Sequence, residues 1–586
     1  MEAITSILTK TVADAFEKCG YDGSNVTVTT SDRLDLCQFQ SNSAFAASKR
    51  AKKPPFVVAE EVSKALGENP IFEKAEFAKP GFINLTLTDE YLVAHTNKII
   101  SDEHMGIVQA ERPDKIILDY GGPNVAKPLH VGHLRPAIIG EAIKRIAIAC
   151  GHTVIGDIHL GDWGLQIGLV IAELSERYPT YACFTDDFTG DKSEVPEITP
   201  EELTEVYPFA SNRAKEDREF SLKARVATAE LQKGREGYIA LWKKIMKVSL
   251  KEMRREYDKL NVHFDLWYGE SDAEPYVPEL LKILTEKGLL RESEGAMVVD
   301  VQEETDKAPM PPVIIKKSDD SNIYATTDLA TILQRYHKFA PDKMWYVTDK
   351  RQELHFTQVF RCAKKAQLVP DEVEFGHFGF GTMNGKDGKP YKTRDGGVMR
   401  LGDFIKTVID GALEKMTESD YVSDEDMEEN ARRIGVAAIK FGDLINHRAK
   451  DYIFDIDKFL SFEGKTGTYI LYTVTRINSI LKKLGIDPSE SRALNGIYTE
   501  AERELLLKLS LTTNVFARSL SEKAPNYICE NLFDIASLFS TFYHDSRIID
   551  EPDEEKKSSW IALMLLTRKF LCHSLDALGI ETVESM

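Results

Sequence analysis

The hydrophobic pattern of the N-terminal part of the chain alternates between helical and strand-like spacing. Apolar residues recur every four positions from Ile4 to Phe16, which predicts a leading helix, and residues 57–66 predict another. Two β-prone runs alternate with these helices, NVTVTT and, after a Pro-Gly pair, FINLTLT. We therefore predict a small N-terminal α/β domain over residues 1–108.

From Lys115 onward, the pattern predicts a buried strand, a helix and a second buried strand. KIILDY and HTVIGDI have the apolar content of buried strands. The helix between them has one apolar stripe, made of Ile139, Ala142, Ile143 and Ile146. We predict that this helix runs from about residue 133 to residue 150. Two strands joined by a helical crossover are typical of a parallel sheet.

We predict that this crossover belongs to a doubly wound, Rossmann-like α/β domain over residues 109–430. Ligands of such sheets bind beyond the carboxyl ends of the strands, which places the 119–133 loop beside a ligand. An acidic stretch at 185–205 predicts a surface excursion, and we expect an insertion at about residues 172–300. A second acidic stretch, at 417–430, predicts an exposed boundary at the end of this domain.

The C-terminal part of the chain has helical periodicity. One apolar stripe consists of Ile470, Val474, Ile477, Leu481 and Leu484, and another of Phe570, Leu571, Leu575 and Leu578. Gly579 directly follows the second stripe, at a position where glycine commonly ends a helix. We predict an all-helical domain over residues 431–586.

The composition is that of a folded globular protein and not of a disordered, collagenous or disulfide-rich chain. The 586 residues include 42% hydrophobic and 29% charged residues, and the formal net charge is -20. This charge argues against a protein that coats nucleic acid indiscriminately, because phosphate binding favours broad basic surfaces. The net charge does not exclude local basic patches, such as RAKK at 50–53, although each patch could equally be an ordinary solvated face.

The seven cysteines are scattered and none falls in a C-x-x-C pair. We therefore expect reduced thiols, a cytoplasmic protein and no structural zinc or other metal ion held by the protein. The first residues show no basic region ahead of an apolar core, which predicts that there is no secretory signal. The densest apolar run, at 561–566, is far shorter than the roughly 20 residues of a membrane-spanning helix. We expect no membrane contact.

The strongest chemical signal is PNVAKPLHVGH at residues 123–133. His130 and His133 lie three apart at a predicted helix start, so both can face one ligand, and Gly132 lets a bulky group approach the backbone. Free backbone N–H groups and the helix dipole favour an anion at that place, so the motif predicts a polyphosphate site. An alternative is purely structural, with the two histidines capping and packing the helix start.

Two common nucleotide-binding motifs are missing from the sequence. There is no GxxxxGK[ST], and GFGTMNG at 379–385 has Asn384 where GxGxxG requires glycine. Imidazoles aimed at phosphate oxygens would instead stabilise the negative charge that grows on a departing pyrophosphate. Such a device needs no covalent intermediate.

The segment DYGGPNVAKPLHVGHLRPAIIGEAIKRI and the following HLGDWGLQIG resemble the ATP-binding region of class I aminoacyl-tRNA synthetases, specifically of the arginyl-tRNA synthetase family. The resemblance continues over most of the chain, through YPFASNRAKED, VHFDLWYGES, IYATTDLATILQRY, GKDGKPYKTRDGGVMRL, DYIFDIDKFLSFEGKTGTYILY and LGIETVESM. It implies an arginine–tRNA ligase that acts as a monomer. Such an enzyme converts L-arginine and ATP, accompanied by Mg2+, to arginyl-adenylate and pyrophosphate. It then transfers arginine to the terminal ribose of tRNA(Arg).

The resemblance also implies roles for residues of the quoted stretch. His130, Gly132 and His133 would hold the ATP phosphates. Asn124 would bind the α-amino group of arginine, and Lys127 would supply positive charge to the phosphates. Judged without the resemblance, Asn124 is equally well a turn residue and Lys127 a solvated one.

One segment departs from the pattern of the wider class. Most class I synthetases carry a KMSK-like loop, and the matching segment here is PYKTR at 390–394. Thr393 stands in place of the usual second lysine, and the resemblance implies that Lys127 replaces it. Lys386, Lys389, Lys392 and Arg394 could all reach the phosphates of ATP from this glycine-rich loop, and the sequence leaves open which of them does so.

For the amino acid, the resemblance places four residues around the guanidinium group, Asp119, Tyr324, Asp328 and Gln352. Carboxylates accept directional N–H bonds from a planar guanidinium, whereas lysine fits this geometry poorly. Tyr324 and Asp328 are four apart and therefore lie on one helical face. An alternative for Asp328 is a helix N-cap, because DLATILQRY opens a helical pattern.

Contacts with tRNA are implied at both ends of the chain. The N-terminal domain would contact the outer corner of the tRNA, and the helical C-terminal domain would read the anticodon by stacking on unpaired bases. Met586 would contact an anticodon base. The alternative for Met586 is an ordinary frayed terminus.

Two other functions account for part of the chain. A different HxGH nucleotidylyltransferase, acting on a small substrate, would not need the helical C-terminal domain. A tRNA-binding paralogue without catalysis would not need His130, His133, Asn124 and Asp328.

Overall fold

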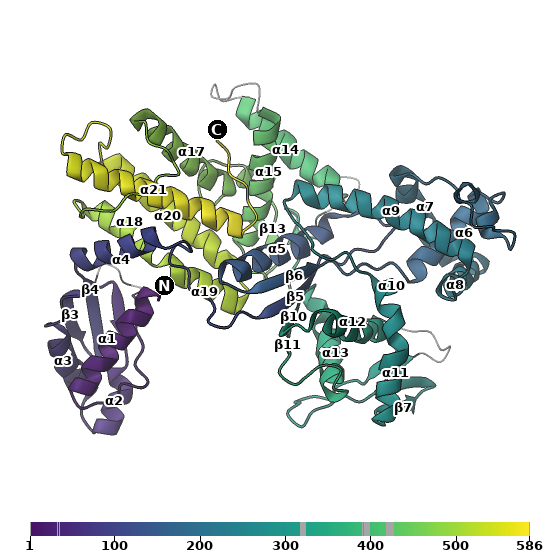
Figure 1. Ribbon diagram of the computed structural model, residues 1–586, viewed down its shortest axis with the longest axis horizontal. Coiled ribbons are helices and arrows are strands. Elements are labelled where there is room, and N and C mark those ends of the chain that lie inside the picture. The colour runs from purple at the N-terminus through teal and green to yellow at the C-terminus, as the bar shows by residue number, and fades with distance from the viewer. Residues whose placement is uncertain are drawn as a thin grey trace.

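The computed structural model describes residues 2–31, 33, 36–316, 324–389, 391, 399–417 and 427–584. Figure 1 shows an N-terminal α/β domain, a central sheet, an insertion and a C-terminal bundle of helices. The N-terminal domain and the bundle lie to the left of the central sheet in this view, and the insertion extends to the right. The predicted fold class, an α/β core with a small α/β domain and a helical domain, is confirmed.

The N-terminal domain is an antiparallel sheet covered by helices. The helices are α1 (Ile4–Lys18), α2 (Ala44–Ala51), α3 (Pro55–Leu66) and α4 (Asp89–Ser101). The strands are β1 (Thr29–Thr30), β2 (Phe39–Ser41), β3 (Phe72–Ala78) and β4 (Phe82–Leu87), in the order β1-β2-β4-β3. The predicted strand NVTVTT contributes only β1, because Val26 and Val28 are buried in the core without joining the ladder.

The central sheet has four parallel strands in the order β11-β10-β5-β6. They are β5 (Lys115–Tyr120), β6 (Thr153–Asp157), β10 (Lys343–Val347) and β11 (Glu374–His377). Three helices connect or cover them, α5 (Leu134–Ala149), α12 (Tyr324–Phe339) and α13 (Glu353–Lys365). The chain leaves β5 toward β6 on one side and returns to β10 on the other. Between β5 and β10 the strand order reverses, which is where ligands of doubly wound sheets bind.

An insertion follows β6. It begins with α6 (Leu165–Arg177), α7 (Pro200–Glu216), α8 (Arg218–Gln232) and α9 (Glu236–Lys259), and two short 3-10 turns, Ala182–Phe184 and Lys192–Glu194, precede α7. It continues with α10 (Glu270–Ala273), the 3-10 turn Glu274–Tyr276, α11 (Val277–Glu286) and a small sheet of β7 (Leu290–Ser293), β8 (Ala296–Val299) and β9 (Val313–Lys316). Just before α10, the chain returns from the insertion to the edge of the central sheet. Leu160, which follows β6, and Gly269, which precedes α10, pair there in a parallel bridge.

The C-terminal part of the chain is helical, as predicted. After β12 (Met383–Asn384) come α14 (Leu401–Thr417), α15 (Met427–Leu444), β13 (Tyr452–Ile453), α16 (Ile456–Phe459), α17 (Gly467–Leu484), α18 (Glu500–Ser510), α19 (Thr512–Glu522), α20 (Asn526–Asp545) and α21 (Glu554–Ala577). The second predicted stripe is buried along α21, and Gly579 follows it with a φ of 67°. Of the predicted acidic boundary, residues 418–426 lie outside the described residues.

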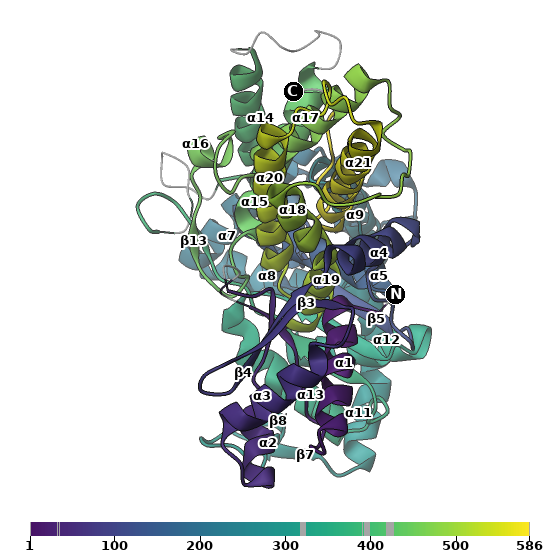
Figure 2. The ribbon, with the colours of Figure 1, turned by 90° about the vertical axis from the view of Figure 1, so that its left-hand side faces the viewer.

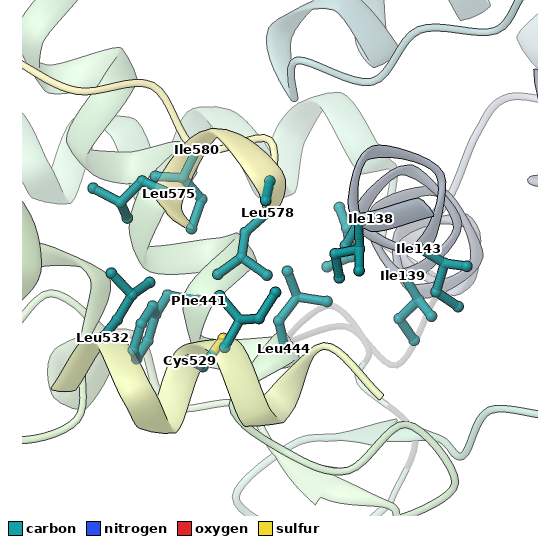
Figure 3. Packing of buried hydrophobic residues seen from close by; sticks show 14 of the residues in the cluster. Ile138, Ile139, Ile143, Phe441, Leu444, Cys529, Leu532, Leu575, Leu578 and Ile580 are labelled. Carbon is teal, nitrogen blue, oxygen red and sulfur yellow. The ribbon is translucent and has the colours of Figure 1, made fainter. Parts of the chain in front are cut away.

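The helix that follows β5 has two neighbours. One side of α5 covers the central sheet, and the other packs against α15, α19 and α21 of the C-terminal bundle. Figure 3 shows Ile138 and Ile139 of α5 beside Leu444 and Leu578 of the bundle. The hydrophobic core is therefore continuous from the sheet into the C-terminal domain.

The N-terminal domain is attached to the bundle through α4. Figure 2 shows α4 beside α18, and Arg503 Nε of α18 donates to Asp89 Oδ1 of α4 at 2.7 Å. Among the described helices, none is both long enough and apolar enough to cross a membrane.

Candidate active site

A cavity of about 720 Å³ lies at the carboxyl ends of β5 and β10. Eight residues singled out from the sequence line it, Asp119, Asn124, His130, Gly132, His133, Tyr324, Asp328 and Gln352. They come from three separate regions of the chain, and the parallel sheet brings them together. Lys392, Arg394 and Met586 lie outside the described residues.

The two histidines form the turn that starts α5. The turn is a 3-10 helix (Val131–His133), in which His130 Nδ1 accepts a hydrogen bond from Gly132 N at 3.1 Å and His133 Nδ1 accepts one from His130 N at 3.1 Å. The ring centroids are 4.0 Å apart. The alternative interpretation, in which the two histidines cap the helix start, is therefore partly right, because both rings accept hydrogen bonds from backbone N–H groups of this turn.

This capping determines how each ring meets a ligand. A neutral imidazole whose Nδ1 accepts a hydrogen bond carries its proton on Nε2. Burial, aided by the charge of Lys127, lowers the pKa of His130 to about 4. Burial, His130 and Lys127 together lower the pKa of His133 to about 3. Both rings are therefore neutral at neutral pH, and each has an Nε2–H donor left for an anionic ligand.

Gly132 leaves room for the ring of His130, which lies two residues before it in the chain. A Cβ atom at Gly132 would come 2.8 Å from Cε1 of His130 and 2.9 Å from its Nδ1. From the sequence, this glycine was expected to let a ligand approach the backbone. The geometry shows a second reason for it, which is room for the His130 ring.

Asp119 is less available than the sequence suggested. It is 7% exposed, and its Oδ2 accepts from Arg335 Nη2 at 2.6 Å. Arg335 is itself fully buried and also donates to Asp157 Oδ2 at 2.7 Å. Burial raises the pKa of Asp119, whereas the charge of Arg335 lowers it. One oxygen of Asp119 is thus already bound to a guanidinium inside the protein.

Asp328 and Tyr324 lie one turn apart on α12, as predicted. Because α12 begins at Tyr324, Asp328 lies within the helix, and the alternative that it caps the helix is wrong. Its Oδ2 accepts from His355 Nε2 at 2.6 Å, and this hydrogen bond raises the pKa of His355. The Tyr324 hydroxyl accepts from Gln166 Nε2 at 3.4 Å. The hydrogen bond from His355 thus orients the carboxylate of Asp328 at the cavity wall.

One carboxylate of the cavity was not singled out from the sequence. Glu270 is the first residue of α10 and lines the cavity together with Asp328 and His159. Burial, Asp162 and Asp328 raise the pKa of Glu270 to about 7, although His159 opposes them. The signal was present in the quoted match VHFDLWYGES, but no pattern in that segment marks its glutamate as a ligand.

Asn124 is held against the other side of the same opening. It pairs with Gly161 in a parallel bridge, and a Cβ atom at Gly161 would come 2.2 Å from Asn124 Oδ1. Only glycine leaves room for the asparagine side chain at that position. The loop after β6 therefore fixes the position of Asn124. An ordinary turn residue would not need such a close fit to Gly161.

Lys127 lines a second cavity, of about 490 Å³, between α7, α9 and α14. The same cavity is lined by Arg400, which forms an antiparallel bridge with His130. The charge of Lys127 nevertheless acts on both histidines, since it lowers their pKa values. Lys127 thus lines a different cavity from the other predicted residues that the structure describes.

Family models match nearly the whole chain. Residues 95–456 match the model described as "tRNA synthetases class I (R), catalytic domain". Residues 470–586 match a "DALR anticodon binding domain", and residues 2–87 match an "Arginyl tRNA synthetase N terminal domain".

Similar proteins carry the same name over full length. The chain is 48% identical to the arginine–tRNA ligase of Alkaliphilus oremlandii over 100% of both chains, and 47% identical to that of Agathobacter rectalis over 100% of both. Among solved structures, arginyl-tRNA synthetase from Plasmodium falciparum superposes with a TM-score of 0.81 at 25% identity, covering 100% of both chains. The Thermus thermophilus arginyl-tRNA synthetase shares the fold, with a TM-score of 0.78 at 21% identity over 100% of both chains.

Proposed function

The chain belongs to the arginyl-tRNA synthetase family, and from this premise we propose that it is an ATP-dependent arginine–tRNA ligase whose chemistry takes place in the cavity between β5 and β10. The arginine carboxylate attacks the α-phosphate of ATP, arginyl-adenylate forms and pyrophosphate leaves. The terminal ribose of tRNA(Arg) then takes the arginyl group. The observation that carries the proposal is that His130 and His133 line one cavity together with the carboxylates of Glu270 and Asp328.

His130 and His133 act as neutral hydrogen-bond donors to the phosphates. Each has its Nδ1 engaged by a backbone N–H, so the Nε2–H is left for a phosphate oxygen. Negative charge grows on the leaving pyrophosphate, and fixed donors stabilise that charge without reorganisation. Gly132 completes the turn, and Lys392 and Arg394 add positive charge to the phosphates. No protein nucleophile is needed, because the arginine carboxylate is the attacking group.

Lys127 adds positive charge from behind the histidine turn. Its charge already reaches both imidazoles across the turn. Mg2+ would enter together with ATP. Magnesium is commonly held by nucleotide phosphates and water and not by a cage of protein side chains.

Arginine is recognised by paired carboxylates. Asp328 and Glu270 meet the guanidinium, while Tyr324 and Gln352 line the opening beside them. Two negative groups suit the planar, permanently charged fork of arginine better than the point charge of lysine. Asp119 contributes through the oxygen that Arg335 leaves unused. Asn124 binds the α-amino group.

The remaining domains serve the tRNA. We propose that residues 1–108 contact its outer corner, that residues 109–430, with the insertion at about 172–300, form the catalytic domain, and that residues 431–586, ending at Met586, bind the anticodon. The enzyme acts as a monomer in the cytoplasm, where its seven free cysteines stay reduced.

The test is charging of total tRNA by the purified chain with ATP, Mg2+ and each labelled amino acid in turn. We expect acid-precipitable counts with arginine alone. Charging with another amino acid would retain the class and refute the assignment of Asp328 and Glu270. No charging with any amino acid would favour a tRNA-binding paralogue without catalysis.

A further inference from the structure

A buried arginine follows the two histidines on α5. Arg135 is 2% exposed, and its Nε donates to Asp443 Oδ2 at 2.9 Å. Its Nη1 donates to the carbonyl oxygens of Gly381 at 2.5 Å and Lys450 at 3.1 Å. The guanidinium carbon lies 5.0 Å from the ring centroid of Tyr452. One side chain thus joins the histidine helix, the segment after β11 and the chain that enters the C-terminal domain.

The segment that Arg135 holds at Gly381 leads into the predicted phosphate loop. Residues 380–383 line the active-site cavity, and PYKTR at 390–394 follows soon after in the sequence. On its other side, this segment is held by Asp451, whose Oδ1 accepts from Thr382 N at 2.7 Å. A Cβ atom at Gly381 would come 2.5 Å from the same oxygen. With such tight packing, Arg135 determines the distance between the histidine turn and the start of the loop.

The pair between Arg135 and Asp443 is incompletely bonded. Arg135 Nη2 and Asp443 Oδ1 are both buried and have no hydrogen-bond partner among the residues that the structure describes. An unsatisfied buried donor or acceptor costs free energy. Nε and Nη2 form one edge of the guanidinium, and a rotation of the carboxylate would join both oxygens to that edge as a bidentate pair.

Asp443 connects this joint to α15, which belongs to the catalytic-domain match at 95–456 and packs against α17 and α20. It lies on α15 next to Leu444, which packs beside Ile138 of α5 in the continuous core (Figure 3). A shift of α15 within the bundle would therefore move Asp443 relative to α5. Because proteins are close-packed inside, such a shift is transmitted and not absorbed.

We propose that Arg135 is a positioning residue for arginine activation, which holds the loop-bearing segment at Gly381 against the histidine turn and, through Asp443 of α15, couples this geometry to the C-terminal helices α17 and α20. The inference rests on the proposed function and deepens it.

The first test is Arg135→Lys. A lysine retains the positive charge, but its single ammonium group cannot bond Asp443, Gly381 and Lys450 in the same fork geometry. In pyrophosphate exchange with tRNA present, we expect KM for ATP to rise at least about fivefold, while KM for arginine changes less than about twofold. The effect falls on ATP because the displaced segment carries the phosphate loop.

Arg145→Lys is the matched control. Arg145 lies on the same helix, and its guanidinium joins Glu141 Oε1 at 2.8 Å and Asp576 Oδ1 at 2.9 Å, so it also ties α5 to the C-terminal domain. It makes no contact with the segment at Gly381 in the hydrogen bonds of the described residues. We expect this variant to lower the melting temperature and to leave KM for ATP unchanged.

Asp443→Asn keeps the shape of the pair and decides the matter if Arg135→Lys does not fold. We expect it to raise KM for ATP and also to raise the tRNA concentration needed for half-maximal exchange. A fall in kcat that follows the folded fraction by circular dichroism, with both KM values unchanged, would overturn the proposal. A wild-type chain that fails to charge arginine would overturn the proposed function instead, so the two failures are distinguishable.

Discussion

The carboxylate of Glu270 makes arginine recognition dependent on pH. Its pKa is raised to about 7, chiefly by burial and also by the nearby charges of Asp162 and Asp328. Only the ionised form pairs with a guanidinium, so a proton and arginine compete for this site. Arginine binding then favours the ionised form and releases the proton. As pH falls below 7, we expect KM for arginine to rise.

The magnitude follows from the titration of one carboxyl group. With a pKa of about 7, the ionised fraction is about one tenth at pH 6 and about nine tenths at pH 8, so KM for arginine should be about tenfold higher at the lower pH. His355 acts in the same direction, because its protonation neutralises Asp328, to which it is hydrogen-bonded at 2.6 Å. KM for ATP provides the internal comparison, since neither carboxylate faces the phosphates in the proposed arrangement.

The assay is pyrophosphate exchange at saturating ATP, with arginine varied at several pH values between 6 and 8. Glu270→Gln is the control variant, since a glutamine keeps the size of the side chain and does not titrate. We expect it to raise KM for arginine at pH 8 and to flatten the dependence on pH. If KM for arginine in the wild-type protein changes less than about twofold over this range, the assignment of Glu270 to the guanidinium is refuted.

Three further substitutions separate the roles proposed for the site. Asp328→Asn should raise KM for arginine far more than KM for ATP, because the lost charge faces only the guanidinium, and equal increases would contradict the assignment. His130→Ala removes one Nε2–H donor and should lower kcat of activation by about 100-fold to 1000-fold with KM for arginine nearly unchanged; a kcat within about tenfold of wild type would show that this histidine only caps the helix. Lys127→Ala should lower the activation rate by orders of magnitude and leave tRNA binding, measured by filter retention, nearly unchanged; an intact activation rate would refute its role as the replacement for Thr393.

The local elements and the position of the site were readable from the sequence. The apolar spacing in α1 and α5 corresponds to faces that are buried, because a helical period of about 3.6 residues leaves a direct trace in the order of residues. The histidine spacing indicated a helix start with an anion site, and the structure places this turn at the carboxyl ends of the strands. Such features depend on neighbours in the chain, so a single sequence records them.

Contacts between distant segments were not readable in this way. Glu270 reaches the cavity only because the chain returns from the insertion to the sheet at Gly269. Asp119 was expected beside the guanidinium group of the substrate, but one of its oxygens already binds Arg335, which lies far along the chain. Even a short separation can mislead, because Lys127 lies only one turn of chain before His130 and yet lines a different cavity. The path of the backbone between the two residues, and not their spacing in the sequence, decides which cavity each of them lines.

The sequence by itself determined the leading helix, the crossover from β5 through α5 to β6, the helical character of the C-terminal part and the turn that forms the predicted anion site. It did so because each of these depends on the spacing of residues that are close together in the chain. Only the tertiary structure decided which charges line the cavity and which are paired inside the protein. Pairs such as Arg335 with Asp119 and Arg135 with Asp443 join segments far apart in the chain, and burial then sets their charge and availability.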